Sequence, residues 1–477
     1  MSSMPVLVAG LVFSSALVAT TSHHEPLSTS AFAARIGGDA SNPPLLVNIS
    51  KLPHTVEVNL TAAVTRLAFQ PGVMSQAFSY NGHVPGPTLD VREGDHVIIH
   101  FRNELPEATT VHWHGIHLPF ESDGSPFHPI QPGESHDYVF TVRRGTAGTY
   151  WYHPHPDKRT GFAIGKGLFG AIVVHAADDP LPPMTEKLLI LSDNRFLADG
   201  TIDFPDAASH PGGIDEENGR EGPVLFVNGK VMPTISIRSG EFQRWRVVNA
   251  SAGRIFRIAI PGQTMIQVGT DGGLMERPVE VKEVLLATGE RVELLVSGGA
   301  IGTTTTLQNL PYDRYSPHTR PADWNVTRDL VTLRTTNDPP LPATAIPARL
   351  RTIVPLDTAR ATAVRTIVFG QGIINGHTMD MARVDVSTRV GATEIWDIAN
   401  IVGMDHPFHL HGFQFQVIDR DGVPEPYRAW KDMLNIPRHS TARIIVRYDD
   451  YPGKWMFHCH ILDHEDHGMM GVLEVKP

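Results

Sequence analysis

The chain has a single cysteine, Cys459, near its C-terminus. His464 follows it after five residues and Met469 after ten. A thiolate, an imidazole and a weakly held thioether are the ligands of a blue-copper electron-transfer site, so this spacing predicts such a site. A lone cysteine is more often a small buried hydrophobic side chain. The prediction therefore depends on histidines elsewhere in the chain.

Two histidines, His458 and His460, flank this cysteine. Side chains alternate between the two faces of an extended strand, so these imidazoles should point away from the thiolate. They could serve a second metal centre that is joined to the first through the cysteine backbone. Three further His-x-His pairs support this interpretation: His112 with His114, His153 with His155, and His409 with His411.

One sequence pattern occurs three times: Asn-Gly, then a glycine, then an asparagine nine residues after that glycine. The Asn-Gly pairs begin at Asn81, Asn228 and Asn375 and are equally spaced along the chain. The segments that close the pattern are 95–102, 241–248 and 392–399. They alternate apolar and polar residues between turn residues, which is typical of half-buried strands. The pattern predicts three β-sandwich domains of similar topology.

The two outer copies of this pattern carry histidines where the middle copy does not. The residues nine and eleven positions after the closing asparagine are, copy by copy, His112 and His114, Ile258 and Ile260, and His409 and His411. The four His-x-His pairs supply eight imidazoles, which could meet where the outer domains face each other and would suit three copper ions. We expect the middle domain to be a spacer without metal ligands.

Composition favours an all-β protein and limits its partners. The 477 residues include 42 glycines and 38 prolines, and the predicted strands are short and frequent. The net charge of -11 argues against binding to nucleic acid. One cysteine cannot form an intrachain disulfide bond, so the thiol is free for a metal. Pro-rich joints at 178–184 and 337–347 predict domains at 45–177, 183–336 and 345–477.

The N-terminus has features of an export signal. Residues 5–19 form an apolar run, and the segment 31–33 (Ala-Phe-Ala) suits cleavage at its end. We therefore expect residues 1–33 to be a signal peptide and the protein to be secreted or periplasmic, although no basic residue precedes Arg35. We expect no membrane span in the mature chain, and we expect residues 35–45 to form a flexible leader.

Four motifs give the chain its resemblance to a known family. They are HWHG (112–115), WYHPH (151–155), HPFHLHG (406–412) and HCHILDHEDHGMM (458–470). Over residues 45–477 the chain resembles the multicopper oxidases, and its last motif is most similar to that of bacterial three-domain laccases and cuprous oxidases. The resemblance implies three cupredoxin-like Greek-key β-sandwich domains and four copper ions: one of type 1, one of type 2 and a type 3 pair.

The resemblance also implies a role for each candidate ligand. The type 1 copper would be bound by His406, Cys459 and His464, with Met469 as the axial ligand. The type 2 copper would be bound by His112 and His409. The type 3 pair would be bound by His114, His153, His155, His411, His458 and His460. Asp123 and Glu465 match the family's acidic residues near the trinuclear site and on the dioxygen path, so we expect them to carry protons. An Asp-Gly sequence such as 123–124 also often forms a turn.

The function that the resemblance implies is a copper-dependent oxidase. It would couple the one-electron oxidation of phenolic or aromatic donors, as laccases do, to the four-electron reduction of dioxygen to water. The alternative is a cuprous oxidase that converts Cu(I) to Cu(II) for copper tolerance. A non-catalytic scaffold protein would be expected to have lost copper ligands, and none is missing.

The choice between organic donors and Cu(I) depends on the surroundings of the type 1 site. The chain has 14 methionines but no Met-rich insertion. We therefore expect the edge of His464 to be open to organic donors. Met404, two residues before His406, is the one nearby candidate for contact with Cu(I), and packing in the core is the simpler explanation for it.

Overall fold

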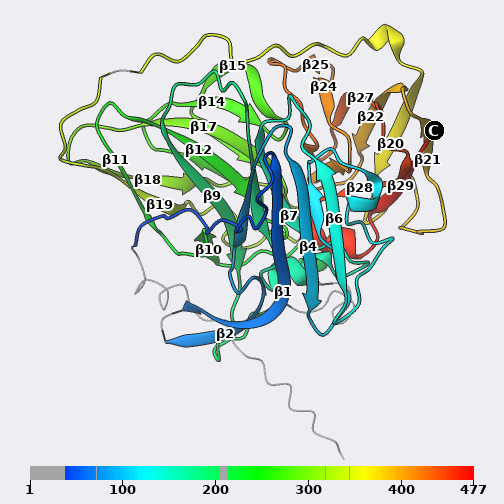
Figure 1. The fold of residues 1–477 in the computed structure, drawn as a ribbon, viewed down its shortest axis with the longest axis horizontal. Helices are drawn as coiled ribbons and strands as arrows, with labels where there is room; N and C mark the ends of the chain where they lie inside the picture. Colours follow the sequence, from blue (N-terminus) through cyan, green and yellow to red (C-terminus); the bar gives the residue numbers. More distant parts are fainter. Residues whose placement is uncertain (1–37, 71, 205–212, 317–318, 343) are drawn as a thin grey trace, which may run out of the picture.

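The computed structural model describes residues 38–70, 72–204, 213–316, 319–342 and 344–477. The predicted signal peptide, residues 1–33, lies outside the described residues. The described chain is built mainly of strands, which form three β-sandwiches (Figure 1). This confirms the predicted all-β fold class.

The first sandwich consists of two four-stranded sheets that share one hydrophobic core. One sheet has the order β2-β1-β4-β6, with β1 (Thr55–Gln70), β2 (Val73–Tyr80), β4 (His96–Glu104) and β6 (Ser135–Thr141). The other has the order β3-β8-β7-β5, with β3 (Gly86–Arg92), β5 (His112–His114), β7 (Gly148–His153) and β8 (Gly170–His175). In β4, Val97, Ile99 and Phe101 are buried, whereas the residues between them face outward. This alternation is what the sequence pattern predicts.

The second sandwich has a six-stranded sheet and a five-stranded sheet. The first, in the order β10-β9-β12-β17-β14-β15, contains β9 (Thr185–Asn194), β10 (Val224–Val227), β12 (Phe242–Asn249), β14 (Met265–Thr270), β15 (Gly273–Val281) and β17 (Arg291–Ser297). The other, in the order β11-β19-β18-β13-β16, contains β11 (Thr234–Ile237), β13 (Phe256–Ala259), β16 (Glu283–Leu286), β18 (Thr304–Asn309) and β19 (Arg328–Thr335).

The third sandwich has two five-stranded sheets. The first, in the order β20-β22-β27-β24-β25, contains β20 (Ala363–Phe369), β22 (Thr393–Asn400), β24 (Phe415–Arg420), β25 (Val423–Pro424) and β27 (Thr441–Arg447). The other, in the order β21-β29-β28-β23-β26, contains β21 (Val386–Arg389), β23 (His406–Leu410), β26 (Met433–Ile436), β28 (Gly453–Cys459) and β29 (Met470–Lys476).

The helices are short. They are α1 (Thr160–Gly165), α2 (Ile214–Asn218), α3 (Leu462–Asp466) and the 3-10 turns η2 (Phe120–Ser122) and η4 (Thr358–Arg360). Across the described ranges, none of the helices has the length and apolar character that a membrane span requires.

The three sandwiches repeat one scheme of strand pairing. In one sheet of each, an early strand runs parallel to a later one: β1 with β4, β9 with β12, and β20 with β22. In the opposite sheet the corresponding parallel pairs are β3 with β8, β11 with β19, and β21 with β29. The predicted similarity of topology is therefore confirmed.

The repeated Asn-Gly pairs form the same turn in each sandwich. Asn81, Asn228 and Asn375 have φ angles of 50°, 52° and 51°, a left-handed conformation that asparagine and glycine adopt most readily. In each copy, the asparagine Oδ1 accepts a hydrogen bond from a backbone N–H of the sandwich's first strand. Its Nδ2 donates to the carbonyl two residues earlier in that strand. The Asn-Gly turn is thus hydrogen-bonded to the first strand of each sandwich.

The closing asparagines, Asn103, Asn249 and Asn400, are buried at the ends of β4, β12 and β22. Each Oδ1 accepts from the backbone N–H two residues later. Each Nδ2 donates to a backbone carbonyl just before the next strand (Glu107, Arg254 or Met404) and to a second carbonyl farther along the chain (Ile130, Leu286 or Ile436). The asparagines therefore fix the positions of β5, β13 and β23, and two of these strands carry the His-x-His pairs.

The segment before the first sandwich is not a flexible leader, so this expectation is wrong for its described part. Ala40 packs in the core of the second sandwich and pairs with Thr234. The side chain of Asn42 accepts a hydrogen bond from the N–H of Leu188. The Pro-rich joints lie between β8 and β9 and between β19 and β20, and the bounds 45–177, 183–336 and 345–477 stay a prediction.

Candidate metal centres

Strand pairing in the two outer sandwiches aligns the His-x-His pairs. In the first sandwich, β5 runs antiparallel to β7 and places His112 opposite His153. In the third, β23 runs antiparallel to β28 and places His409 opposite His458. The same register in both sandwiches explains why the histidines occur at matched positions of the sequence repeat.

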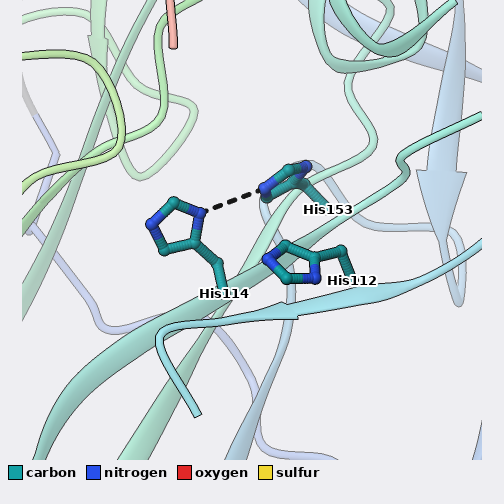
Figure 2. Close-up of side chains that lie close together, drawn as sticks. All are labelled: His112, His114 and His153. Carbon is teal, nitrogen blue, oxygen red and sulfur yellow. Dashed lines mark hydrogen bonds between the residues drawn. The ribbon is translucent and has the colours of Figure 1, made fainter. Parts of the chain in front are cut away.

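The eight histidines of these pairs meet in one buried cluster between the outer sandwiches. His112 stacks on His411 with 3.9 Å between ring centroids, and His114 stacks on His409 with 3.8 Å. Each stacked pair therefore joins the first sandwich to the third. Figure 2 shows the rings of His112, His114 and His153 gathered in this cluster.

Hydrogen bonds fix the tautomer of several rings. Nδ1 lies 2.8 to 3.0 Å from a backbone carbonyl in His112, His153, His409 and His458. A carbonyl can only accept, so Nδ1 of each ring carries the hydrogen and Nε2 carries the lone pair. In His411, Nδ1 lies 3.0 Å from the carboxylate of Asp123, which leaves Nε2 free in the same way.

His114 is oriented the other way. Its Nε2 lies 3.1 Å from Oδ1 of Asp432, so this nitrogen carries the hydrogen and Nδ1 carries the lone pair. Nδ1 then faces Nε2 of His153 across 3.3 Å, the contact that is dashed in Figure 2. Neither nitrogen has a hydrogen to donate to the other.

The cluster fits a group of metal ions. Lone pairs face each other at 3.1 Å between Nε2 of His411 and Nε2 of His458, and such contacts are repulsive unless a cation lies between them. Nε2 of His112 and Nε2 of His409 are buried without a partner. Burial also lowers the pKa of the cluster histidines His114, His153, His155, His409, His411 and His460 well below the usual value, and that of His458 to about 3. Neutral imidazoles are good ligands for copper.

A second group of ligands lies beside the cluster, in the third sandwich. Donor atoms of His406, Cys459 and His464 all lie within 4.8 Å of one another. Sγ of Cys459 lies 3.6 Å from Nδ1 of His464. Met469 is fully buried, and its carbonyl accepts a hydrogen bond of 3.1 Å from the N–H of Cys459.

These donors suit one copper ion of the blue-copper kind. Nε2 of His464 donates to a backbone carbonyl, so its Nδ1 lone pair faces the cysteine sulfur. Burial lowers the pKa of His464 to about 4 and raises the pKa of the Cys459 thiol. A cation beside the sulfur would favour the thiolate, since metal coordination deprotonates thiols.

Both predicted acidic residues contact the histidine cluster. Oδ2 of Asp123 lies 3.0 Å from Nδ1 of His411, and its backbone carbonyl accepts from His112. Asp123 also closes a turn, because Gly124 has a φ of +73° and lies against Val111. Asp123 therefore both forms the turn expected of an Asp-Gly sequence and contacts the histidine cluster.

Glu465 is fully buried and contacts other histidines of the cluster than Asp123 does. Its carboxyl oxygens lie 3.3 Å from Nε2 of His155 and 3.2 Å from Nδ1 of His458. Burial raises the pKa of Glu465 to about 8. At neutral pH this side chain is therefore mainly a protonated carboxylic acid, which can donate a proton.

The edge of His464 is not open to solvent, so this expectation is wrong. His464 is 5% exposed, and its Nε2 donates a hydrogen bond of 2.9 Å to the carbonyl of Glu217. Glu217 belongs to α2 of the middle sandwich. The fold places its carbonyl against His464, although the two residues are far apart in the sequence. Local motifs around His464 could not reveal this cover.

The middle sandwich is more than a spacer, so this expectation also needs correction. It contributes no residue to the groups of potential metal ligands in the described chain. However, Thr288 donates a hydrogen bond of 2.6 Å to the carbonyl of His460, and Gly289 lies against the imidazole of that histidine. Arg291 forms an ion pair with Asp432. No motif in the sequence distinguishes these residues.

Comparison with known proteins agrees with the site. The sequence matches the multicopper oxidase family over residues 61–179, 149–301 and 348–477. A multicopper oxidase of Staphylococcus aureus is 30% identical over 428 residues, which cover 87% of this chain and 88% of that protein. A laccase of Bacillus subtilis is 26% identical over 84% of this chain and 91% of its own length.

A solved structure is similar over almost the whole chain. The multicopper oxidase of Campylobacter jejuni, described as a metallo-oxidase, has a TM-score of 0.87 at 32% identity, and the match covers 96% of this chain and 98% of that one. The fold and the histidine cluster thus define a copper-binding oxidoreductase of three cupredoxin-like sandwiches. The chain belongs to the multicopper oxidase family, in which dioxygen is the general electron acceptor.

Proposed function

We propose that this protein is a laccase-like oxidase that couples one-electron oxidation of small aromatic donors to four-electron reduction of dioxygen to water. The observation that supports it most is a pocket of about 280 Å³ beside the covered edge of His464. Asn218 and Gly219 line this pocket and directly follow Glu217, whose carbonyl accepts the hydrogen bond from His464. The pocket and the imidazole of His464 therefore contact the same short segment, 217–219.

The chemistry of the pocket suits an aromatic molecule. Tyr312, Tyr315 and Trp324 contribute to its lining, and aromatic rings stack on or pack edge-to-face against planar donors. The charged side chains are paired with one another, as in the 2.9 Å contact of Arg254 with Glu221. No methionine, cysteine or histidine is among the described residues of the lining. The described lining of the pocket thus lacks the soft ligands that Cu(I) prefers.

We propose four copper ions, held as the family resemblance implies. His406, Cys459, His464 and axial Met469 would hold the type 1 ion, and His112 with His409 the type 2 ion. The type 3 pair would be held by His114, His153, His155, His411, His458 and His460. When bound, copper supplies the one-electron redox chemistry and the site at which dioxygen is reduced.

The protein's own groups position the reaction and supply protons. Cys459 is joined by peptide bonds to His458 and His460, which provides a short covalent path between the two groups of ligands. A carboxyl oxygen of Glu465 lies 3.3 Å from Nε2 of His155, and Oδ2 of Asp123 lies 3.0 Å from Nδ1 of His411. We propose that both acids pass protons to reduced oxygen. Exposure to the extracellular or periplasmic space, which the N-terminal sequence suggests, is part of this proposal.

The test uses copper-loaded enzyme, a dimethoxyphenol and an oxygen electrode. Trp324→Ala removes an aromatic wall of the pocket, and the loss of one aromatic contact should raise KM for the phenol about 2- to 10-fold. The rate with a small inorganic donor such as ferrocyanide should stay the same. If no phenol is oxidised without excess copper, or if KM does not change, the proposal is wrong.

A second candidate function, oxidation of Cu(I), is favoured by a different surface. Met379 and Met381 lie in a loop beside the predicted type 1 site, where the N–H of Met379 donates 2.7 Å to the carbonyl of Gly468. Met381 is 40% exposed, and thioethers select Cu(I). Met404, by contrast, is 1% exposed and packs in the core of the third sandwich.

The Met loop can be tested separately from the pocket. The double variant Met379→Leu/Met381→Leu keeps side-chain volume but removes both sulfurs. Under the laccase-like proposal, it oxidises phenols and Cu(I) as fast as the wild type does. Selective loss of Cu(I) oxidation would instead assign the cuprous oxidase function.

A further inference from the structure

Arg291 joins all three sandwiches at the edge of the histidine cluster. It begins β17 of the middle sandwich and is fully buried. Its Nε donates to the carbonyl of Thr149 in the first sandwich, at 3.1 Å. Its Nη1 and Nη2 donate to the two carboxylate oxygens of Asp432 in the third sandwich, at 2.7 and 2.6 Å. A guanidinium that binds both oxygens of a carboxylate fixes its plane and position.

Asp432 in turn contacts two histidines of the cluster. Its carboxylate Oδ1 lies 3.1 Å from Nε2 of His114, and its backbone carbonyl lies 2.9 Å from Nδ1 of His409. The two histidines stack on each other, one from each outer sandwich. A single residue thus fixes both members of a stacked pair.

These contacts have a chemical consequence for His114. Other cluster rings whose Nδ1 hydrogen is held by a carbonyl present Nε2 to the centre of the cluster, but His114 presents Nδ1. It can do so only when the hydrogen is on Nε2, where the carboxylate of Asp432 accepts it. We propose that Arg291 and Asp432 are a positioning pair that sets the tautomer of His114 and thereby makes the trinuclear copper site competent to bind metal.

The residue after His114 is Gly115, and the absence of a side chain there leaves room for the Arg291–Asp432 ion pair. A Cβ atom at Gly115 would lie 2.4 Å from Nη2 of Arg291 and 2.5 Å from Oδ2 of Asp432. Only glycine can therefore follow His114 while the ion pair remains in place. Gly115 also has a φ of +85°, which other residues rarely adopt.

The ion pair with Arg291 also argues against Asp432 as a metal ligand. Donor atoms of His114, His409 and Asp432 lie within 4.8 Å of one another, so the carboxylate could be taken for a metal ligand. Both of its oxygens, however, are held by Arg291, and one also accepts from His114. The pair thus acts through the histidine, an arrangement common around metal sites. The role is independent of which donor the enzyme oxidises.

The test is the variant Asp432→Asn. An amide has only one acceptor oxygen, so it cannot accept from both Nη groups of Arg291 and from Nε2 of His114, as the carboxylate does. At least one of these donors then faces the amide NH2 group, and the position of the His114 hydrogen is no longer held as in the wild type. Loss of such an outer contact typically weakens metal binding about 10- to 100-fold. We expect this loss for type 2 and type 3 copper in competition with a chelator, with electron paramagnetic resonance and copper analysis as readouts. The blue type 1 colour should remain.

Glu293→Gln is the matched control. Glu293 lies two residues after Arg291 on β17, is equally buried and binds Thr149 and Arg246, but contacts none of the cluster histidines. This variant should lose stability and keep wild-type copper affinity. Equal copper loss in both variants would mean that domain packing is responsible, and would overturn the proposal. Unchanged copper affinity in Asp432→Asn would overturn it as well.

If Asp432→Asn does not fold, Arg291→Lys decides the question. Lysine keeps the positive charge but cannot bind both carboxylate oxygens in one plane. The proposal predicts the same selective loss of type 2 and type 3 copper in this variant. Full copper binding with an unchanged resonance spectrum would refute it. A wild-type protein that bound no copper at all would instead refute the proposed function.

Discussion

Replacing Gly289 by alanine should disturb the histidine cluster from the middle sandwich. An added Cβ would lie 3.0 Å from Nε2 and 3.1 Å from Cδ2 and Cε1 of His460, over the face of the ring. Neither nitrogen of this ring has a hydrogen-bond partner in the described structure. Its orientation therefore depends on packing against neighbours such as Gly289.

The size of the effect follows from these contacts. Carbon atoms normally meet at about 3.5 to 4.0 Å, so the ring must move by roughly half an ångström. The φ of Gly289 is +81°, and an alanine there is strained by about 1 to 3 kcal/mol. Overpacking adds about 1 to 3 kcal/mol. We expect a total loss of stability of about 2 to 6 kcal/mol.

A matched control separates strain from displacement of the ring. Gly262 has a φ of +71° and lies in the same sandwich, but an added Cβ there would have no neighbour within 4 Å. Gly262→Ala should lose stability through strain alone, with copper content and spectrum unchanged. Thermal unfolding of both apo variants and resonance spectra of both copper-loaded variants are the measurements. A Gly289→Ala protein with a wild-type type 3 site would refute the reasoning.

Further predictions concern the ligands and the acids. Met469→Leu should raise the type 1 reduction potential, since a lost thioether disfavours Cu(II); redox titration of the blue band checks this, and an unchanged potential would mean that Met469 is not axial. Asp123→Asn and Glu465→Gln should slow oxygen reduction more than donor oxidation in stopped-flow assays. Burial raises the pKa of Glu465, so in the wild type oxygen reduction should fall as rising pH removes this proton, and oxygen uptake measured against pH checks this. Met404→Leu should leave phenol and Cu(I) oxidation unchanged in initial-rate assays.

Much of the fold could be predicted because its determinants are local. The Asn-Gly turns need a left-handed backbone, and the closing asparagines must satisfy buried backbone groups, so both recur with the sandwich. The His-x-His pairs follow from strand periodicity, and their register follows from the repeat. Asp123 lies nine residues after His114 and Glu465 lies inside the last motif, and both were found through the family resemblance.

The features that sequence did not reveal arise from contacts between sandwiches. Glu217 covers His464 through a backbone carbonyl, which any residue type could supply. Arg291 has no motif near it in the sequence, and its role depends on an ion pair with Asp432 in another sandwich. Docking of Ala40 onto the middle sandwich is likewise a long-range contact. Composition and spacing carry little information about such pairs.

The most direct test of the central claim compares wild-type protein with Cys459→Ser after copper loading. The wild type should be intensely blue and should consume one dioxygen for every four electrons taken from a phenol. Cys459→Ser should be colourless and without oxidase activity, while circular dichroism shows the same β-rich fold. A Cys459→Ser protein that stays blue, or that still couples phenol oxidation to oxygen uptake, would contradict the account.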